Sequence, residues 1–165
     1  MRNAFLTVSL VMLLAGCKTT PESGGSKSSS SPVTAEATPL LRLKREPCFG
    51  RCPSYVVTVS AKGEVEFDGE SSVLVKGKST AMLSADQLAT IKSKLEASAF
   101  EQWKAAYDDR TMSDMASVEL TWNGRTIRHY LGDGKAPKEL TTLEDELDAL
   151  IGTSQWVTGK GAPVQ

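Results

Sequence analysis

The chain has few of the residues that most often build metal sites and active sites. Its 165 residues include three cysteines and one histidine, and if Cys17 is lipidated only Cys48, Cys52 and His129 remain. A tetrahedral structural zinc site needs four Cys or His ligands. It has no excess of either charge, with 19 basic and 20 acidic residues and a formal net charge of -1. Domains that bind nucleic acid usually carry a strongly basic face. We therefore expect no metal, no cofactor and no nucleic acid partner.

The apolar stretch near the start of the chain is shorter than the roughly 20 residues that a membrane-spanning helix needs. It lies in the uncharged run of residues 3–16, which follows the single charge of Arg2. A positive start, a short apolar core and an end of small residues are typical of a secretory signal peptide. We predict that residues 1–16 are such a signal and are removed.

The end of this segment, Leu-Ala-Gly-Cys at residues 14–17, resembles the lipobox of bacterial lipoproteins. The resemblance implies cleavage between Gly16 and Cys17 and attachment of a lipid, with acyl chains such as palmitate, to the sulfur of Cys17. Several acyl chains hold a protein on a membrane far more firmly than one. Aspartate after the cysteine commonly retains Gram-negative lipoproteins at the inner membrane, and here that residue is Lys18. The resemblance thus implies a lipid-anchored protein of the bacterial cell envelope, on the outer membrane; the alternative is an ordinary signal followed by a chance cysteine.

Residues 17–38 are predicted to be the lipidated cysteine and a flexible linker. The linker contains six serines, four threonines, two prolines and two glycines, and almost no apolar residues. Burial of such side chains cannot offset the entropy lost on ordering a chain. Its reach is about 25 Å on average and roughly 70 Å when fully extended. The linker can therefore hold a domain away from the bilayer surface.

Residues 39–158 are predicted to form a single α+β domain, followed by a disordered tail at 159–165. Alternation of apolar and polar residues predicts strands at 40–44, 55–59, 64–68 and 73–82, with a turn at Asp68-Gly69. Asn123-Gly124 predicts a two-residue hairpin that places Val118 opposite His129 on its apolar side. We expect a partly buried, hydrogen-bonded histidine there rather than a catalytic base.

Two helices complete this domain. Ser84 and Gln87 match a capping box, which predicts a helix over about 85–98. Pro137 and Gly152 frame a second helix with a stripe of leucines. The expected architecture has two layers, an antiparallel sheet of about five to six strands with two helices packed on one face.

Cys48 and Cys52 lie in a turn with a proline on each side. Outside the cytoplasm thiols are readily oxidised, and if Cys17 carries lipid these two are the natural pair. A structural disulfide is the favoured interpretation. A redox-active dithiol is a second one, although three residues separate the cysteines and a strand rather than a helix follows. Metal binding is a third.

The segment Cys-Phe-Gly-Arg-Cys-Pro-Ser-Tyr at residues 48–55 resembles the opening of a family of uncharacterised domains found in secreted bacterial proteins and lipoproteins. Glycine turns at Gly63 and Gly69 and the later residues Phe100, Tyr107 and Asp114 fit the same pattern. The resemblance covers most of residues 40–157. The family has no established activity, so the resemblance supports a domain boundary and leaves the function open.

Three residues are candidates for a functional role: Tyr55, Asp114 and His129. Asp114 lies with Asp108 and Asp109 in a predicted loop whose spacing matches no calcium-binding loop, so we expect a solvated loop. The acidic residues of the second helix are expected on its solvent face; they are Glu144, Asp145, Glu146 and Asp148.

These patterns favour a membrane-anchored envelope lipoprotein with a non-catalytic binding or structural module. Its partner would be an envelope protein or polymer. Two alternatives stay open: a thiol–disulfide redox protein that uses Cys48 and Cys52, and a hydrolase with a site near Asp114 and His129. The sequence identifies no catalytic residue and leaves the oligomeric state open.

Overall fold

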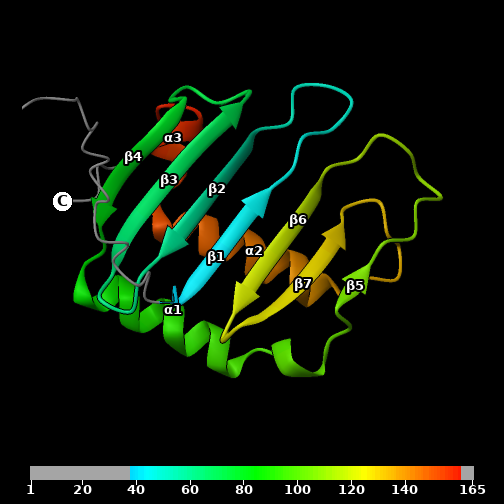
Figure 1. The fold of residues 1–165 in the computed structure, drawn as a ribbon. Helices are drawn as coiled ribbons and strands as arrows, with labels where there is room; N and C mark the ends of the chain where they lie inside the picture. Colours follow the sequence, from blue (N-terminus) through cyan, green and yellow to red (C-terminus); the bar gives the residue numbers. More distant parts are fainter. Residues whose placement is uncertain (1–37, 161–165) are drawn as a thin grey trace, which may run out of the picture. The chain divides into compact units, whose positions relative to one another are not determined.

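The computed structural model describes residues 38–160 (Figure 1). The predicted signal at 1–16, Cys17, the linker up to residue 37 and the tail residues 161–165 lie outside the described residues. Within residues 38–160 the fold is α+β, with a seven-stranded, mostly antiparallel sheet and three α-helices. The strand order is β4-β3-β2-β1-β6-β7-β5. The strands are β1 (Leu41–Arg45), β2 (Ser54–Val59), β3 (Glu64–Ser71), β4 (Gly77–Met82), β5 (Ala106–Tyr107), β6 (Ser117–Trp122) and β7 (Arg125–Tyr130).

The expected hairpin and its register are confirmed. Asn123 and Gly124 join β6 to β7, both with positive φ, and Val118 is paired with His129. The expected count of five to six strands is too low because of β5. This strand has two residues and pairs in parallel with β7. Two residues are too few to produce an alternating pattern in a sequence.

The expected turn at Asp68-Gly69 is wrong. Both residues lie inside β3, which continues to Ser71, and the chain turns only at 72–76 before β4 begins at Gly77. Gly69 is present because the backbone of this turn folds close over it. A Cβ atom at that position would lie 2.1 Å from the carbonyl oxygen of Val75. Glycine inside a strand often marks such a close approach rather than a turn.

Three α-helices accompany the sheet: α1 (Ala85–Ala97), α2 (Lys138–Ile151) and the short α3 (Ser154–Val157). The Ser84–Gln87 capping box begins α1 as expected, and Gly152 in the left-handed conformation ends α2. The sequence pattern predicted two helices and missed α3, whose four residues are too few for a helical period. A short 3-10 helix, Phe100–Gln102, follows α1.

Helices α1 and α2 pack on one face of the sheet, which we call the inner face (Figure 1). Ile91 of α1 and Leu147 of α2 are fully buried together with strand residues such as Leu43 in a single core. Trp156 of α3 closes one side of this core by stacking on Phe67, with ring centroids 4.9 Å apart. The two layers predicted from the sequence are therefore present.

Among residues 38–160, no helix is long and apolar enough to cross a membrane.

Candidate functional site

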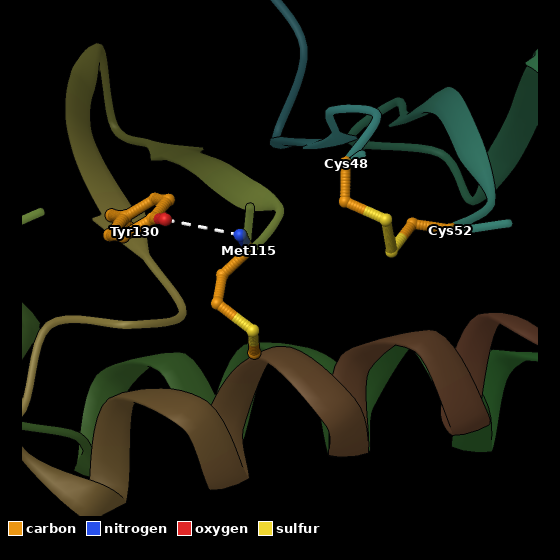
Figure 2. Close-up of a disulfide and its surroundings, with 4 residues drawn as sticks. All are labelled: Cys48, Cys52, Met115 and Tyr130. Atoms are coloured by element: carbon orange, nitrogen blue, oxygen red, sulfur yellow. Dashed lines mark hydrogen bonds between the residues drawn. A yellow bond between two sulfur atoms is a disulfide. The ribbon is translucent and has the colours of Figure 1, made fainter. Parts of the chain in front are cut away.

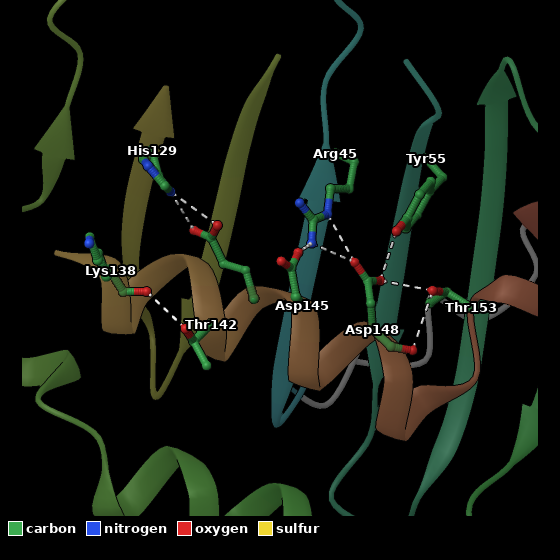
Figure 3. Close-up of polar contacts among 9 residues, drawn as sticks. Arg45, Tyr55, His129, Lys138, Thr142, Asp145, Asp148 and Thr153 are labelled. Carbon is green, nitrogen blue, oxygen red and sulfur yellow. Dashed lines mark hydrogen bonds and ion pairs between the residues drawn. The ribbon is translucent and has the colours of Figure 1, made fainter. Parts of the chain in front are cut away.

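Helix α2 crosses strands β7, β1 and β2 on the inner face, and polar side chains meet along this crossing (Figure 3). The surrounding contacts are apolar. We call the polar side chains that interrupt these contacts the polar row. Its members are Arg45, Tyr55, His129, Glu144, Asp145, Asp148 and Thr153.

Asp148 is the centre of the polar row. Arg45 donates to its Oδ2 from Nε at 2.9 Å, and Nη2 of the same guanidinium lies 2.7 Å away. The Tyr55 hydroxyl donates to Oδ1 at 2.7 Å, and the Thr153 hydroxyl donates to the same oxygen at 3.0 Å. The side chains of Arg45 and Asp148 are each 15% exposed. One carboxylate therefore joins β1, β2 and the end of α2.

The electrostatics of this cluster keep its donors protonated. Burial and the charge of Asp148 raise the pKa of the Tyr55 hydroxyl above its ordinary value of 10.0. Burial alone would lower the pKa of the Arg45 guanidinium. The attraction of Asp148 and the hydrogen bonds to Asp145 and Asp148 outweigh that effect, so the pKa of Arg45 lies above its ordinary value. At neutral pH Tyr55 is thus a fixed donor and Arg45 a fixed cation.

His129 and Glu144 form a second, deeper contact in the polar row. Nδ1 of His129 lies 3.2 and 3.0 Å from the two carboxyl oxygens of Glu144, and the side chains are 3% and 0% exposed. Burial raises the pKa of the Glu144 carboxyl above its ordinary value of 4.5, and the interaction with His129 offsets that rise only in part. Tyr107 of β5 packs edge-on against the imidazole. The pair is therefore enclosed between β7, β5 and α2.

The prediction that the acidic residues of α2 all face solvent is wrong for Glu144 and Asp148. Glu144 is fully buried, and Asp148 lies under the same side of the helix. The spacing could have shown this, because Glu144 follows Leu140 by four residues and precedes Leu147 by three, which puts all three on one face. An acidic residue in such a stripe needs a partner, and His129 on the apolar face of the hairpin was available.

The sequence candidates Tyr55 and His129 both belong to the polar row, whereas Asp114 does not. Asp114 is exposed, has a φ of 69° and accepts a hydrogen bond from its neighbour Ser113. Its loop is held elsewhere by Asp109, whose carboxylate pairs with Lys135 at 2.7 Å. The hydrogen bond from Lys135 lowers the pKa of Asp109. A hydrolase role for Asp114 and His129 stays a prediction.

Cys48 and Cys52 form a disulfide, with Cα atoms 5.5 Å apart, in the loop between β1 and β2 (Figure 2). The second cysteine leads into strand β2, so neither sulfur lies at the start of a described helix. Tyr130 ties the neighbouring loop to the sheet, since its hydroxyl accepts from the Met115 amide and donates to the Met112 carbonyl. A redox role for the cysteine pair stays a prediction.

The cavities on the described part of the chain include three that are large enough for a small ligand. One of about 860 Å³ lies over the outer sheet face and includes Thr58, Glu66 and Thr80. A second of about 600 Å³ lies between α1 and α2 beside Trp103. A third of about 440 Å³ lies at the end of the polar row, and we call it the row pocket. Its lining residues are Arg45, Pro53, Tyr55, Asp148, Ala149, Thr153, Ser154, Val157 and Thr158.

The row pocket is the strongest candidate for a binding site, although the other two cavities are larger. It joins a fixed polar cluster to apolar side chains, and the disulfide loop leads directly to Pro53 at its edge. Specific sites usually combine mostly apolar walls with a few placed polar groups. Neither Asp114 nor His129 lines any of these three cavities.

Within residues 38–160 no group of three or more His, Cys, Asp or Glu side chains is arranged to hold a metal ion. The polar row contains several such residues, but they pair with one another or with Arg45 and Tyr55.

A comparison with models of protein families identifies the family of this domain. The model of a domain of unknown function, DUF6438, matches residues 39–151, which is more than half of the chain. A comparison with curated proteins found no match.

Proposed function

The chain belongs to the DUF6438 family of domains of unknown function, and we propose that it is a lipid-anchored bacterial envelope protein with a non-catalytic binding module. The module binds an uncharged ligand in the row pocket. The observation that carries this proposal is the pocket itself, an opening of about 440 Å³ between the fixed Arg45–Tyr55–Asp148 cluster and apolar walls.

The anchor is proposed from the lipobox-like residues 14–17 and the short apolar segment before them. Lys18 after the cysteine supports delivery to the outer membrane. Metabolic labelling with an alkynyl palmitate analogue is expected to label the wild-type protein and not the Cys17→Ser variant. Labelling that persists in that variant would contradict the anchor.

Binding is favoured over catalysis because the polar groups of the row are already engaged. A catalytic acid or base must reach the substrate proton directly or through one water. The Tyr55 hydroxyl instead donates to Asp148, and the 2% exposed His129 faces Glu144. Side chains bonded to one another in this way hold the pocket walls rigid and are not free to exchange a proton with a ligand.

The charges around the row pocket favour an uncharged ligand. Arg45 is bound by Asp148 and also by Asp145, whose side chain is 66% exposed. Asp148 neutralises Arg45 within the protein, and solvent screens the exposed Asp145, so little net field acts on a ligand. Pro53, Ala149 and Val157 offer apolar contact. Four residues beside the Arg45–Asp148 pair carry hydroxyl groups: Tyr55, Thr153, Ser154 and Thr158. Amide and sugar groups of envelope polymers fit this chemistry.

The test is a nitrogen-15 NMR titration of the mature chain with N-acetylglucosamine and with a blocked dipeptide, using acetate as the anionic comparison. We expect saturable shifts of the Tyr55, Ala149 and Val157 amides with at least one neutral probe and none with acetate. Ala149→Trp fills the pocket from an exposed helix position and abolishes the shifts, whereas Thr142→Trp on the same helix leaves them unchanged. Shifts scattered over the chain, or shifts that survive Ala149→Trp, would contradict the proposal.

A further inference from the structure

Most of the exposed large hydrophobic side chains in residues 38–160 lie at one end of the sheet. The structure has five such side chains: Phe49, Leu74, Met82, Met112 and Met115. The antiparallel pairing brings the loops at 46–53, 72–76 and 108–116 to the same end, and Met82 alone of the five lies at the other (Figure 1). The chain enters β1 at that other end, at Leu41.

Two of these loops share one pattern, an apolar side chain followed two residues later by a cation. Phe49 is 90% exposed and precedes the exposed Arg51, and Leu74 is 66% exposed and precedes the exposed Lys76. Neither cation forms an ion pair with another residue of the described part of the chain. The loops are neighbours, because they join β1 to β2 and β3 to β4.

Both loops are also stiff. The Cys48–Cys52 disulfide closes the first. The second is tied to α3, since the amides of Leu74 and Val75 donate to carbonyl oxygens of α3 at 3.1 and 2.9 Å. Groups that are already ordered lose little conformational entropy on binding, so their burial contributes to affinity more fully.

We propose that this pair of loops docks on an anionic bilayer. Phe49 and Leu74 enter the boundary between headgroups and acyl chains, and Arg51 and Lys76 meet lipid phosphates. A bilayer suits two apolar side chains that protrude separately. At every lateral position it has an apolar layer of acyl chains beneath a layer of charged headgroups. The third loop is left out, since it carries Asp108, Asp109 and Asp114 against Arg110 alone.

The inference rests on the proposed function in one respect, because a lipid on Cys17 would keep the domain beside a membrane. The 21 residues from 18 to 38 span at most about 70 Å. The length of β1, from its start at Leu41 to the end of the sheet that carries the two loops, is only about 17 Å. The chain outside the sheet is thus long enough for the loop end to face the bilayer.

Photocrosslinking to lipid tests the docking. The mature chain carries a histidine tag in place of Cys17 and is held on phosphatidylethanolamine–phosphatidylglycerol vesicles by a nickel-chelating lipid. Benzoylphenylalanine replaces Phe49, Leu74 or, as the matched apolar control at the other end, Met82. We expect lipid adducts at 49 and 74 to exceed those at 82. They are expected to fall about fivefold for Arg51→Gln, and further on vesicles without phosphatidylglycerol, where neither cation meets an anionic surface.

The second variant is Phe49→Ser, an exposed change that leaves the fold intact and lowers adducts at 74 by about tenfold. Equal adducts at all three positions, or none at 49 on the tag-bound vesicles, would overturn the docking. Adducts at 49 between two copies of the chain would overturn it as well and assign the loops to self-association. The tag makes the result independent of native lipidation, so a failed anchor and a failed docking surface are told apart.

Discussion

Replacing Asp148 by asparagine is expected to destabilise the domain much more than replacing Asp145, although both carboxylates bind the same guanidinium. The Arg45–Asp145 and Arg45–Asp148 hydrogen bonds are each 2.9 Å long. Their exposure differs, because the side chain of Asp145 is 66% exposed and that of Asp148 is 15% exposed. The two variants therefore compare a largely buried carboxylate that also accepts from Tyr55 and Thr153 with an exposed carboxylate that binds Arg45 alone.

The magnitude follows from what each change leaves behind. Asp148→Asn leaves the largely buried Arg45 with one exposed partner and removes the anionic acceptor of Tyr55. Breaking a buried pair costs about 3–5 kcal/mol, and the residual exposure of this one puts our estimate at about 2–3 kcal/mol. Asp145→Asn removes an exposed ion pair and costs about 0–0.5 kcal/mol.

Urea and thermal unfolding, followed by circular dichroism at neutral pH, measure both variants. For a domain of this size the melting temperature falls roughly 4 °C per kcal/mol, so we expect a loss of roughly 8–12 °C for Asp148→Asn and at most about 2 °C for Asp145→Asn. Equal losses for the two variants would refute the argument that the buried contact holds α2 to the sheet.

Three further predictions concern other parts of the fold. Because burial raises the folded-state pKa of Glu144, its stabilising contribution is present at low pH and is lost as the pH rises above 4.5. In urea unfolding at a series of pH values, we therefore expect the free energy of unfolding of Glu144→Gln to rise relative to that of the wild type as the pH increases. Profiles that stay parallel would contradict this. Gly69→Ala puts a Cβ 2.1 Å from a carbonyl oxygen and costs about 3 kcal/mol in chemical unfolding, whereas Gly134→Ala, where a Cβ meets nothing within 4 Å, costs almost nothing. Replacing Cys48 and Cys52 by serine removes a short loop closure worth about 2 kcal/mol, and a redox titration is expected to place the bond below about -300 mV; a higher potential would favour the redox alternative.

Local signals in the sequence predicted the elements that local chemistry determines. Asn123-Gly124 predicted the hairpin because both positions need positive φ, which these residues tolerate. Ser84 and Gln87 predicted the start of α1 because their side chains cap its first amides reciprocally. These elements depend on neighbours within a few residues.

Other features depend on residues far away in the sequence and were missed. In the sequence alone, Gly69 suggests a turn. In the folded domain the carbonyl oxygen of Val75 approaches this position too closely for a Cβ atom, which explains the glycine. The spacing of Glu144 from Leu140 and Leu147 indicates a buried position, but its partner His129 lies in the hairpin and is brought opposite it only by the fold. Tyr55 and His129 were found as candidates, but Arg45 and Asp148 were not, because their contact spans 103 positions in the chain.

Mass spectrometry of the native protein most directly tests the proposal that a lipid on Cys17 holds this domain at the bacterial envelope. We expect an N-terminal peptide that begins at Cys17 and carries acyl chains on that residue. A mature protein that begins elsewhere, or one that begins at Cys17 with an unmodified sulfur, would contradict it.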